Sequence, residues 1–311
     1  MDSPTTHRLH TVSPYLLLTL TPLFWACNWI IGRGLSTSIP PMAMTFYRWF
    51  FALIMLAPFA WPHLRREWPI VWRNRRVMLL LGVVGVGSHN ALAYLGLNYT
   101  TAMNGVILNS FIPVMIIALS WFFLRQRLAG VQLLGVAVSL SGVLAILSQG
   151  SLETLARLEV NRGDVFVILS MLLWSIYTIC LRWKPAGLNM LTFLFVIAVI
   201  GDSAILPLYL AETAMGSPMS FTPTSIVALL CVALFSSVLA YIFWNRGVEQ
   251  VGASVAGLFV HLMPVFGTVL AWLFLDEQLH AYHLAGIALI LSGIFVASRA
   301  AARTAVAAPL D

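Results

Sequence analysis

The chain has 311 residues, of which 60% are apolar and only 9% are charged, and its formal net charge is +6 at pH 7. A soluble domain carries about 25% charged residues, so this composition excludes an ordinary soluble enzyme or binding module. It indicates a polytopic membrane protein, and the basic excess is therefore not interpreted as a nucleic-acid-binding surface.

A membrane-spanning helix needs about 20 predominantly apolar residues. Stretches of this kind predict ten spans, at residues 15–32, 41–61, 77–97, 102–124, 130–148, 163–183, 190–211, 224–245, 252–275 and 281–298. Only short connectors are left between them, so no extramembrane domain has room to form. The polar first 14 residues precede a span long enough to stay as an anchor, which indicates that no targeting segment is removed.

Lysines and arginines are distributed unevenly between the two sides of these spans. Of the 17, Arg48 falls inside span 2, 13 fall on the side of the N-terminus, and three (Arg33, Arg157 and Arg162) fall on the other side. Cytoplasmic loops carry an excess of basic residues. The sequence therefore predicts a multi-pass membrane protein with both termini in the cytoplasm.

The chain also contains an internal duplication. Residues 96–143 align with residues 247–294 without a gap, and fifteen of the 48 positions are identical, whereas shared apolar composition would give roughly one in ten. With five spans in each half, the second half must enter the membrane from the opposite side. The basic loop Arg125-Gln126-Arg127 and its acidic counterpart Asp276-Glu277-Gln278 agree with such an inversion.

We therefore predict an all-α integral membrane protein with ten transmembrane helices, arranged as two five-helix inverted-topology repeats. Its expected parts are a cytoplasmic N-terminal tail (1–14), a first repeat (15–148), a periplasmic connector (149–162), a second repeat (163–299) and a cytoplasmic C-terminal tail (300–311).

Each half ends in the same pattern, which reads Pro113-Val114, Trp121, Phe123-Leu124 and Gly135 in the first copy and Pro264-Val265, Trp272, Phe274-Leu275 and Gly286 in the second. This pattern and the two-repeat layout resemble the EamA group of the drug/metabolite transporter superfamily. Within that group the chain is most similar to the bacterial exporters of aromatic and other neutral amino acids of the YddG type. The resemblance implies a protein of the bacterial inner membrane. It also implies a central cavity framed mainly by spans 3, 4, 8 and 9, with spans 1, 2, 6 and 7 around it and spans 5 and 10 at the periphery.

The two matched prolines, Pro113 and Pro264, lie in the middle of their spans. Each removes one helical hydrogen bond and frees the carbonyl four residues earlier, on Asn109 and Val260. Interrupted helices at matching positions of two repeats indicate a binding site near the midplane of the membrane. The alternative is that the prolines are only tolerated there and bend the helices.

Polar and aromatic side chains gather at a similar depth in spans 1, 3, 4, 6, 8 and 9. Besides the two prolines, the candidate cavity residues are Trp25, His89, Asn90, Tyr94, Asn109, Trp174, Tyr177, Tyr241, Trp244 and His261. Neutral hydrogen-bonding groups suit the ammonium and carboxylate of an amino acid, and aromatic rings suit its side chain. The alternatives are a membrane-interface anchor for Trp244 and a packing role for either histidine.

Two ionisable residues fall inside spans, where burial of a charge is costly and indicates function. Arg48 in span 2 either reaches outward to the membrane surface or meets a substrate carboxylate. Asp202 in span 7 either carries a proton in a coupled transport cycle or is an ion-paired or solvated structural residue.

The remaining features limit the other classes of function. No catalytic or metal-binding motif occurs, so we expect no enzyme, cofactor or metal site. A channel-like uniporter stays possible, because alternating access leaves no sequence motif. The expected partners are a small-molecule substrate and the lipid bilayer. Small residues in spans 5 and 10, such as Gly135, Gly142, Gly286 and Gly293, allow close packing either within a monomer or between the subunits of a homodimer.

Overall fold

The computed structural model describes residues 12–34, 39–97, 99–100, 105, 108–126, 129–151, 153, 161–274 and 278–307. The regular elements within these residues are all helical. Eight helical stretches among them are long and apolar enough to cross a membrane, and Ile112–Leu124 is a shorter apolar helix.

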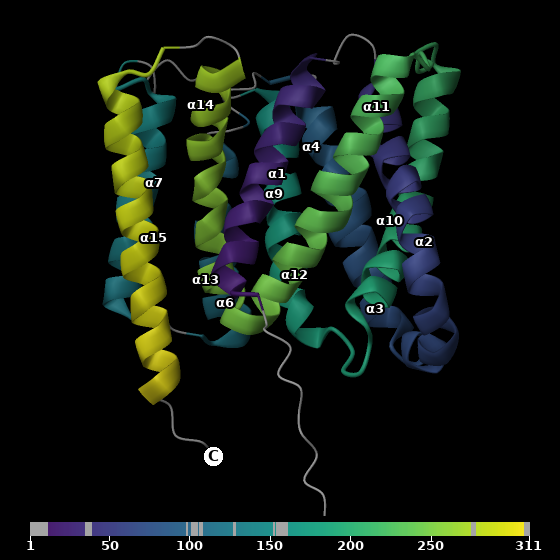
Figure 1. The fold of residues 1–311 in the computed structure, drawn as a ribbon, viewed down its shortest axis with the longest axis horizontal. Coiled ribbons are helices and arrows are strands. Elements are labelled where there is room, and N and C mark those ends of the chain that lie inside the picture. Colours follow the sequence, from purple (N-terminus) through teal and green to yellow (C-terminus); the bar gives the residue numbers. More distant parts are fainter. Residues whose placement is uncertain are drawn as a thin grey trace, which may run out of the picture.

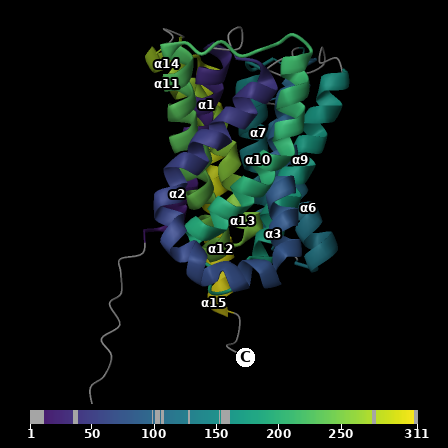
Figure 2. The ribbon, with the colours of Figure 1, turned by 90° about the vertical axis from the view of Figure 1, so that its right-hand side faces the viewer.

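The helices of the first half are α1 (Pro14–Gly34), α2 (Pro41–Arg73), α3 (Arg75–Gly82), the π-helix η1 (Val83–Ser88), α4 (His89–Leu97), α6 (Ile112–Leu124) and α7 (Gly130–Leu147). Those of the second half are α9 (Arg162–Cys180), the 3-10 helix η2 (Leu181–Trp183), α10 (Met190–Ala214), α11 (Pro223–Val232), the π-helix η3 (Ala233–Leu239), α12 (Ala240–Val251), α13 (Ala253–Leu258), the 3-10 helix η4 (Phe259–His261), α14 (Leu262–Phe274) and α15 (Ala281–Ala307). They run side by side between two ends of the bundle (Figures 1 and 2).

We name these ends after two residues. The Lys184 face holds the start of α1 and the ends of α9, α12 and α15, and lies at the bottom of Figure 1. The Glu212 face holds the start of α2 and the end of α10, at the top of the same view. Along the longest axis, α7 and α15 lie at one edge of the bundle and α2 at the other.

Span 2 is longer than the sequence predicts, because α2 continues beyond residue 61 to Arg73. Its 33 residues measure about 50 Å at 1.5 Å per residue, more than the apolar thickness of about 30 Å. The last turns therefore extend past the apolar core, and they carry the exposed Trp61, Trp68 and Trp72, with the Arg65 guanidinium 5.4 Å from the Trp61 ring centroid. Tryptophan and arginine both favour the membrane interface, which explains a helix where hydropathy alone ends a span.

Helix α15 likewise runs to Ala307, beyond the predicted boundary of the second repeat at residue 299. Its last turns are rich in alanine, the residue with the highest helix propensity, which favours continuation of the helix.

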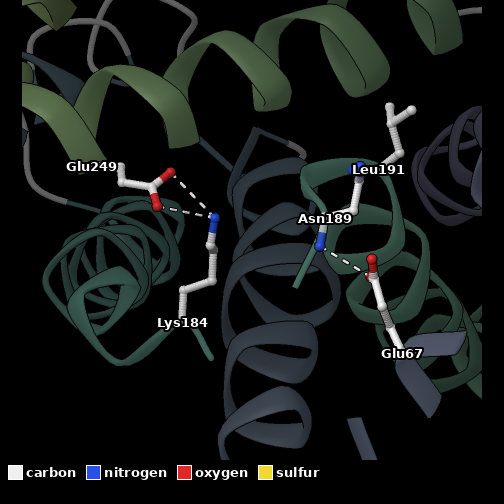
Figure 3. Close-up of polar contacts among 5 residues, drawn as sticks. All are labelled: Glu67, Lys184, Asn189, Leu191 and Glu249. Atoms are coloured by element: carbon white, nitrogen blue, oxygen red, sulfur yellow. Dashed lines mark hydrogen bonds and ion pairs between the residues drawn. The ribbon is translucent and has the colours of Figure 1, made fainter. Parts of the chain in front are cut away.

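Helices from the two halves pack in antiparallel pairs. In the pair α2 and α10, Glu212 near the end of α10 accepts hydrogen bonds from the backbone N–H groups of Met42 and Ala43 in the first turn of α2, at 3.1 and 2.9 Å. At the Lys184 face, Glu67 of α2 accepts from the backbone N–H of Asn189, the N-cap of α10, at 3.0 Å (Figure 3). A glutamate of each helix therefore accepts hydrogen bonds from backbone N–H groups at the start of the other helix. These N–H groups have no partner within their own helix, and a negative charge is favourable at a helix N-terminus.

Helices α7 and α15 cross at four glycines. A Cβ atom on Gly135 would lie 2.6 Å from the carbonyl oxygen of Gly293, and a Cβ on Gly142 would lie 2.6 Å from that of Gly286. In the alignment of the two repeats, Gly135 corresponds to Gly286 and Gly142 corresponds to Gly293. Replacing each glycine by its counterpart in the other half therefore turns one contact into the other. The small faces of these two helices therefore pack against each other within one chain.

Two further pairs, α4 with α9 and α1 with α12, show the same exchange. Gly96 of α4 packs against Val167 of α9, and its repeat counterpart Gly247 of α12 packs against Leu18 of α1. Leu18 lies seven residues before Trp25, and Val167 seven before Trp174. The remaining pair joins the break before α6 to α13 and η4, where Gly257 packs against Pro113.

Candidate functional site

Arg48 of α2 lies inside the bundle with 3% of its surface exposed. Its Nε donates a hydrogen bond to Ser237 Oγ at 2.9 Å, and its Nη2 donates to the Ser236 carbonyl oxygen at 3.4 Å. Its Nη1 lies 3.5 Å from Asn90 Oδ1 and 3.4 Å from the Tyr94 hydroxyl. All four partners are neutral, and in the described part of the chain no carboxylate pairs with this guanidinium.

Asn90 connects Arg48 to Tyr241 on the opposite half. The Asn90 Nδ2 donates to the Val86 carbonyl oxygen at 2.9 Å and to the Tyr241 hydroxyl at 3.3 Å. That hydroxyl donates in turn to the Gly85 carbonyl oxygen at 2.8 Å. Asn90 and Tyr241 occupy the same place in the two repeats, so this contact joins the halves at equivalent residues. We call Arg48, Asn90, Tyr94 and Tyr241 the central network.

The two π-helices supply backbone acceptors to this network. Segments η1 and η3 lie at matching positions of the repeats, and the carbonyls of Gly85 in η1 and Ser236 in η3 accept from Tyr241 and Arg48. A π-helix displaces the backbone hydrogen bonds of an α-helix by one residue and occurs frequently at functional sites. The glycines of span 3 are the one sequence signal near η1, and nothing in the apolar run of η3 marks its geometry.

An aromatic cluster lies next to the central network. The Trp174 ring centroid lies 5.2 Å from that of Trp25, 5.2 Å from that of Tyr177, 5.6 Å from that of Trp244 and 4.9 Å from that of His89. It also lies 5.4 Å from the ring centroid of Tyr241, which links the cluster to the network. We call Trp25, Trp174, Tyr177 and Trp244 the aromatic cluster; it unites four candidates drawn from α1, α9 and α12.

Two Asn–Tyr hydrogen bonds lie at opposite ends of this region. In the first Asn–Tyr pair, Asn28 Nδ2 donates to the Tyr94 hydroxyl at 3.5 Å, near the ends of α1 and α4. In the second, the Tyr177 hydroxyl donates to Asn245 Oδ1 at 2.8 Å, near the ends of α9 and α12 at the Lys184 face. Tyr177 and Asn245 are 0% and 2% exposed, whereas both residues of the first pair are half-buried.

These two pairs are equivalent in the repeats, with the residue types exchanged. The asparagine of the first pair lies three residues after Trp25, and the tyrosine of the second lies three after Trp174. The tyrosine of the first pair lies two residues before Gly96, and the asparagine of the second lies two before Gly247. The same hydrogen bond therefore occurs once in each half, long and half-buried at one end, short and enclosed at the other.

The enclosed pair has an ion pair beside it on the Lys184 face. The Lys184 ammonium lies 3.1 and 3.2 Å from the two carboxylate oxygens of Glu249 (Figure 3). This contact joins the segment after η2 to the end of α12. An exposed ion pair contributes only about 0–1 kcal/mol to stability. We therefore regard the buried second Asn–Tyr pair as the main contact at this end and the ion pair as a minor one.

The two histidines make their hydrogen bonds with neighbouring helices. His261 is buried with Nδ1 2.6 Å from Ser139 Oγ and Nε2 2.9 Å from the Ser110 carbonyl oxygen, so both ring nitrogens have protein partners. His89 Nδ1 lies 3.0 Å from the Ser170 carbonyl oxygen and 2.8 Å from its hydroxyl. Among the polar candidates near the prolines, Asn109 lies outside the central network, with its amide 3.6 Å from the Met263 sulfur.

The helices are interrupted next to both prolines, as the sequence predicts. Ser110 and Phe111 form a turn, and Pro113 is the second residue of α6. In the second half, the 3-10 helix η4 ends three residues before Pro264. The Ser110 carbonyl, in the first of these breaks, accepts the contact from His261 in the second. The two interruptions therefore meet.

Asp202 of α10 is 5% exposed, and its Oδ1 has no hydrogen-bond partner among the described residues. No hydrogen bond or ion pair joins it to Arg48 or to either histidine. In the same residues, no group of three or more His, Cys, Asp or Glu side chains is placed to hold a metal ion.

The structure thus brings together Arg48, Asn90, Tyr94, Tyr241 and the aromatic cluster, while Asn109, His261, Asp202 and the prolines lie apart from that network. Sequence reasoning did not assign the partners Ser170, Ser236 and Ser237 to the site. The one feature of the sequence that could have indicated them is that each is a small polar residue within an apolar span.

Comparison with known proteins identifies the family. The model of the EamA-like transporter family matches residues 12–148 and 161–299. An uncharacterised transporter of Archaeoglobus fulgidus is 28% identical over 289 residues, which cover 91% of this chain and 96% of that protein. The uncharacterised transporter YyaM of Bacillus subtilis is 28% identical over 228 residues, which cover 73% and 74%. Protein PecM of Dickeya dadantii is 24% identical over 231 residues.

A solved structure described as the crystal structure of a protein has the same fold. It superposes with a TM-score of 0.74 at 17% sequence identity, over 93% of this chain and 98% of that one. At this level of identity the likeness shows the fold alone. The family match covers both halves of the chain, and the protein is therefore a multi-pass membrane transporter that belongs to the EamA-like transporter family.

Proposed function

We propose that this transporter exports amino acids, aromatic and other neutral ones, across the bacterial inner membrane from cytoplasm to periplasm by alternating access. The observation that carries the proposal is the central network beside the aromatic cluster, enclosed between antiparallel helices of the two halves. The other candidates are export of different small metabolites or drugs on the same fold, and a facilitative, channel-like uniporter.

The proposal includes ten membrane spans in two inverted repeats. The glycine contacts between α7 and α15 support it, because exchanging the halves converts one contact into the other. The Gly96 and Gly247 contacts support it in the same way. Such pseudo-two-fold repeats are typical of secondary transporters, which bind substrate near the midplane where the repeats meet.

We assign the Lys184 face to the cytoplasm, with both termini on that side. Basic residues at helix ends of this face support the assignment: Arg65, Arg66, Arg73, Arg75, Arg76, Arg125, Arg182, Lys184, Arg246 and Arg299. Cytoplasmic ends of spans carry such an excess. We assign no coupling role to Asp202, since no chain of hydrogen bonds among the described residues joins it to the central network.

The chemistry of the region suits an amino acid. Asn90 and the tyrosine hydroxyls accept and donate hydrogen bonds without adding charge, and the aromatic cluster offers rings for an apolar side chain. Candidate residues away from the network, such as His261 and Pro264, would shape the helix breaks and not contact the substrate.

The two Asn–Tyr pairs would act as alternating closures of the pathway. Equivalent hydrogen bonds at opposite ends allow one end to close when the other opens, which two inverted halves achieve by exchanging conformations. The second pair, short and enclosed, is the closed one here; the first pair, at 3.5 Å and half-buried, is the loosened one.

Tyr177→Phe is expected to loosen the closure at the Lys184 face. The change removes the 2.8 Å bond to Asn245, whose Nδ2 already has no partner in the described residues, so the whole amide is left unpaired. A buried unpaired group costs about 1–3 kcal/mol. Cys180, three residues after Tyr177, reports the opening: in purified protein with Cys27→Ser and Cys231→Ser, a maleimide should label it faster than in the parent.

The matched control is Tyr94→Phe, which removes the 3.5 Å contact of the first pair. It should leave the labelling rate of Cys180 close to that of the parent. Equal acceleration in both variants, or in neither, would rule out the second pair as a closure of this face.

The transport assay tests the proposed function directly. Proteoliposomes loaded with labelled L-phenylalanine should show saturable efflux, and unlabelled amino acid on the outer side should drive counterflow of label. A channel gives efflux without counterflow. Absence of efflux for every neutral and aromatic amino acid would refute the amino-acid proposal while leaving family membership untouched.

A further inference from the structure

Arg48 is a buried cation with no counter-charge among the residues that the structure describes. It is 3% exposed, and its hydrogen bonds reach one carbonyl oxygen, one amide oxygen and two hydroxyl groups. Removing a cation from water costs several kcal/mol, and neutral acceptors offset that cost less well than a carboxylate does. A protein that keeps such a group without an acidic partner leaves a place for an anion.

The two terminal nitrogens are the loosely held part of this side chain. Nε makes the one short bond, 2.9 Å to Ser237, which fixes the orientation of the guanidinium plane. The bonds of Nη1 and Nη2, to Asn90, Tyr94 and the Ser236 carbonyl, measure 3.4–3.5 Å. Charge-assisted bonds from arginine to a carboxylate are about 2.7–2.9 Å long and roughly twice as strong. An arriving carboxylate would therefore displace weak contacts with strong ones.

The fold itself does not require a cation at this position. Counting from the shared pairs Thr45-Phe46 and Thr192-Phe193, the residue two places further on is Arg48 in α2 and Phe195 in α10. Phe195 is a partly buried apolar side chain packed against the core. The antiparallel pair of α2 and α10 thus forms with an aromatic side chain on one helix where the other has arginine, which favours a functional role for Arg48.

Its place in the network connects binding to closure. The Tyr94 hydroxyl lies 3.4 Å from Arg48 Nη1 and 3.5 Å from Asn28 Nδ2, so the first Asn–Tyr pair and the arginine share one oxygen. A ligand that takes the place of Tyr94 on the guanidinium frees this hydroxyl for Asn28. Occupation of Arg48 would therefore favour closure of the first pair.

We infer that Arg48 binds the carboxylate of the transported solute, with Tyr94 and Asn90 as neighbouring hydrogen-bond partners. This inference rests on the proposed function as a transporter of small solutes, and it deepens it by naming the substrate class as carboxylate-bearing. Zwitterionic amino acids and simple monocarboxylates share this chemistry, and the ammonium group distinguishes them.

The test compares ligands that differ in one charged group. Purified wild-type protein is mixed with L-phenylalanine, with L-phenylalaninamide, which lacks the carboxylate, or with 3-phenylpropionate, which lacks the ammonium group, and thermal stabilisation gives their affinities. Both carboxylates should bind about 10- to 100-fold more tightly than the amide, the factor expected for a hydrogen bond to a charged group. Stabilisation by 3-phenylpropionate but not by L-phenylalanine would support the inference, and it would refute the amino-acid proposal if every other neutral and aromatic amino acid also failed to stabilise the protein.

Arg48→Gln and Arg48→Lys assign the effect to the residue. The glutamine variant should lose the preference for carboxylate over amide, and the lysine variant should retain part of it. Arg65→Gln, an exposed arginine on the same helix, is the matched control and should keep the full preference. If the wild-type protein binds acid and amide equally, binds neither carboxylate, or keeps its preference in Arg48→Gln, the inference is wrong. The wild-type comparison stands even where a variant fails to fold.

Discussion

Gly142→Val is expected to give a protein that loses the contact between α7 and α15 and unfolds at markedly lower temperature. A Cβ at this position would lie 2.6 Å from the Gly286 carbonyl oxygen and 2.8 Å from the Leu289 Cβ, so the two helices must separate. Overpacking costs about 1–3 kcal/mol and occasionally more, and here both of the closest atoms belong to the rigid part of a helix. Thermal unfolding of the detergent-solubilised protein measures the loss.

The matched control is Gly267→Ala in α14, where an added Cβ would meet no atom within 4 Å apart from the adjoining residues and backbone of its own helix. Because alanine has a higher helix propensity than glycine, this replacement should leave the free energy of unfolding unchanged or raise it by up to about 1 kcal/mol. If Gly142→Val and Gly267→Ala unfold at the same temperature as the parent, then α7 and α15 do not cross at these glycines.

Trp174→Ala is expected to lower both stability and transport. The side chain is 2% exposed and touches the rings of Trp25, Tyr177 and Trp244, so its truncation opens a cavity at the meeting point of the two halves. Such truncations cost about 3–5 kcal/mol. We expect efflux from proteoliposomes to fall more than the amount of folded protein does, because the aromatic cluster would also lose the wall that meets the substrate.

Trp121→Ala provides the comparison for this change. Trp121 is a tryptophan of the matched motif, but 60% of its surface is exposed on α6. Its truncation should leave efflux per folded molecule unchanged. The role given to the aromatic cluster is wrong if Trp174→Ala transports as well as Trp121→Ala once both are corrected for folded protein.

The duplication and the helix breaks were predictable from the sequence because they rest on residues with fixed backbone consequences. Pro113 and Pro264 cannot continue a helical hydrogen-bond ladder, and the structure has irregular turns next to both. The long apolar stretches predicted spanning helices in the same way, and eight of the ten predicted spans correspond to helices of the described residues that are long and apolar enough to cross a membrane. Helix α2 also continues past the apolar core, where it carries tryptophans and arginines.

The sequence does not predict which side chains of a span point outward and which point into the bundle, because lipid and protein interior are equally apolar. Trp121 and Trp174 both lie in apolar spans, yet one is largely exposed and the other enclosed. For the same reason nothing along the chain pairs Arg48 with Ser237, which follows 189 residues later. The π-helices are a further example: η1 packs against α9 and α10 and η3 packs against α2, and these neighbours are far away in the sequence.

The exchanged residue types in the two Asn–Tyr pairs bear on the ancestry of the chain. A freshly duplicated gene encodes the same two residues in both copies, so at least two replacements have occurred since, either both in one copy or one in each. Replacing one partner first gives either two tyrosines or two asparagines, and both combinations can still bond, as Tyr47 and Tyr209 do here with hydroxyls 2.8 Å apart. The swap was thus open to stepwise mutation without any generation losing the contact.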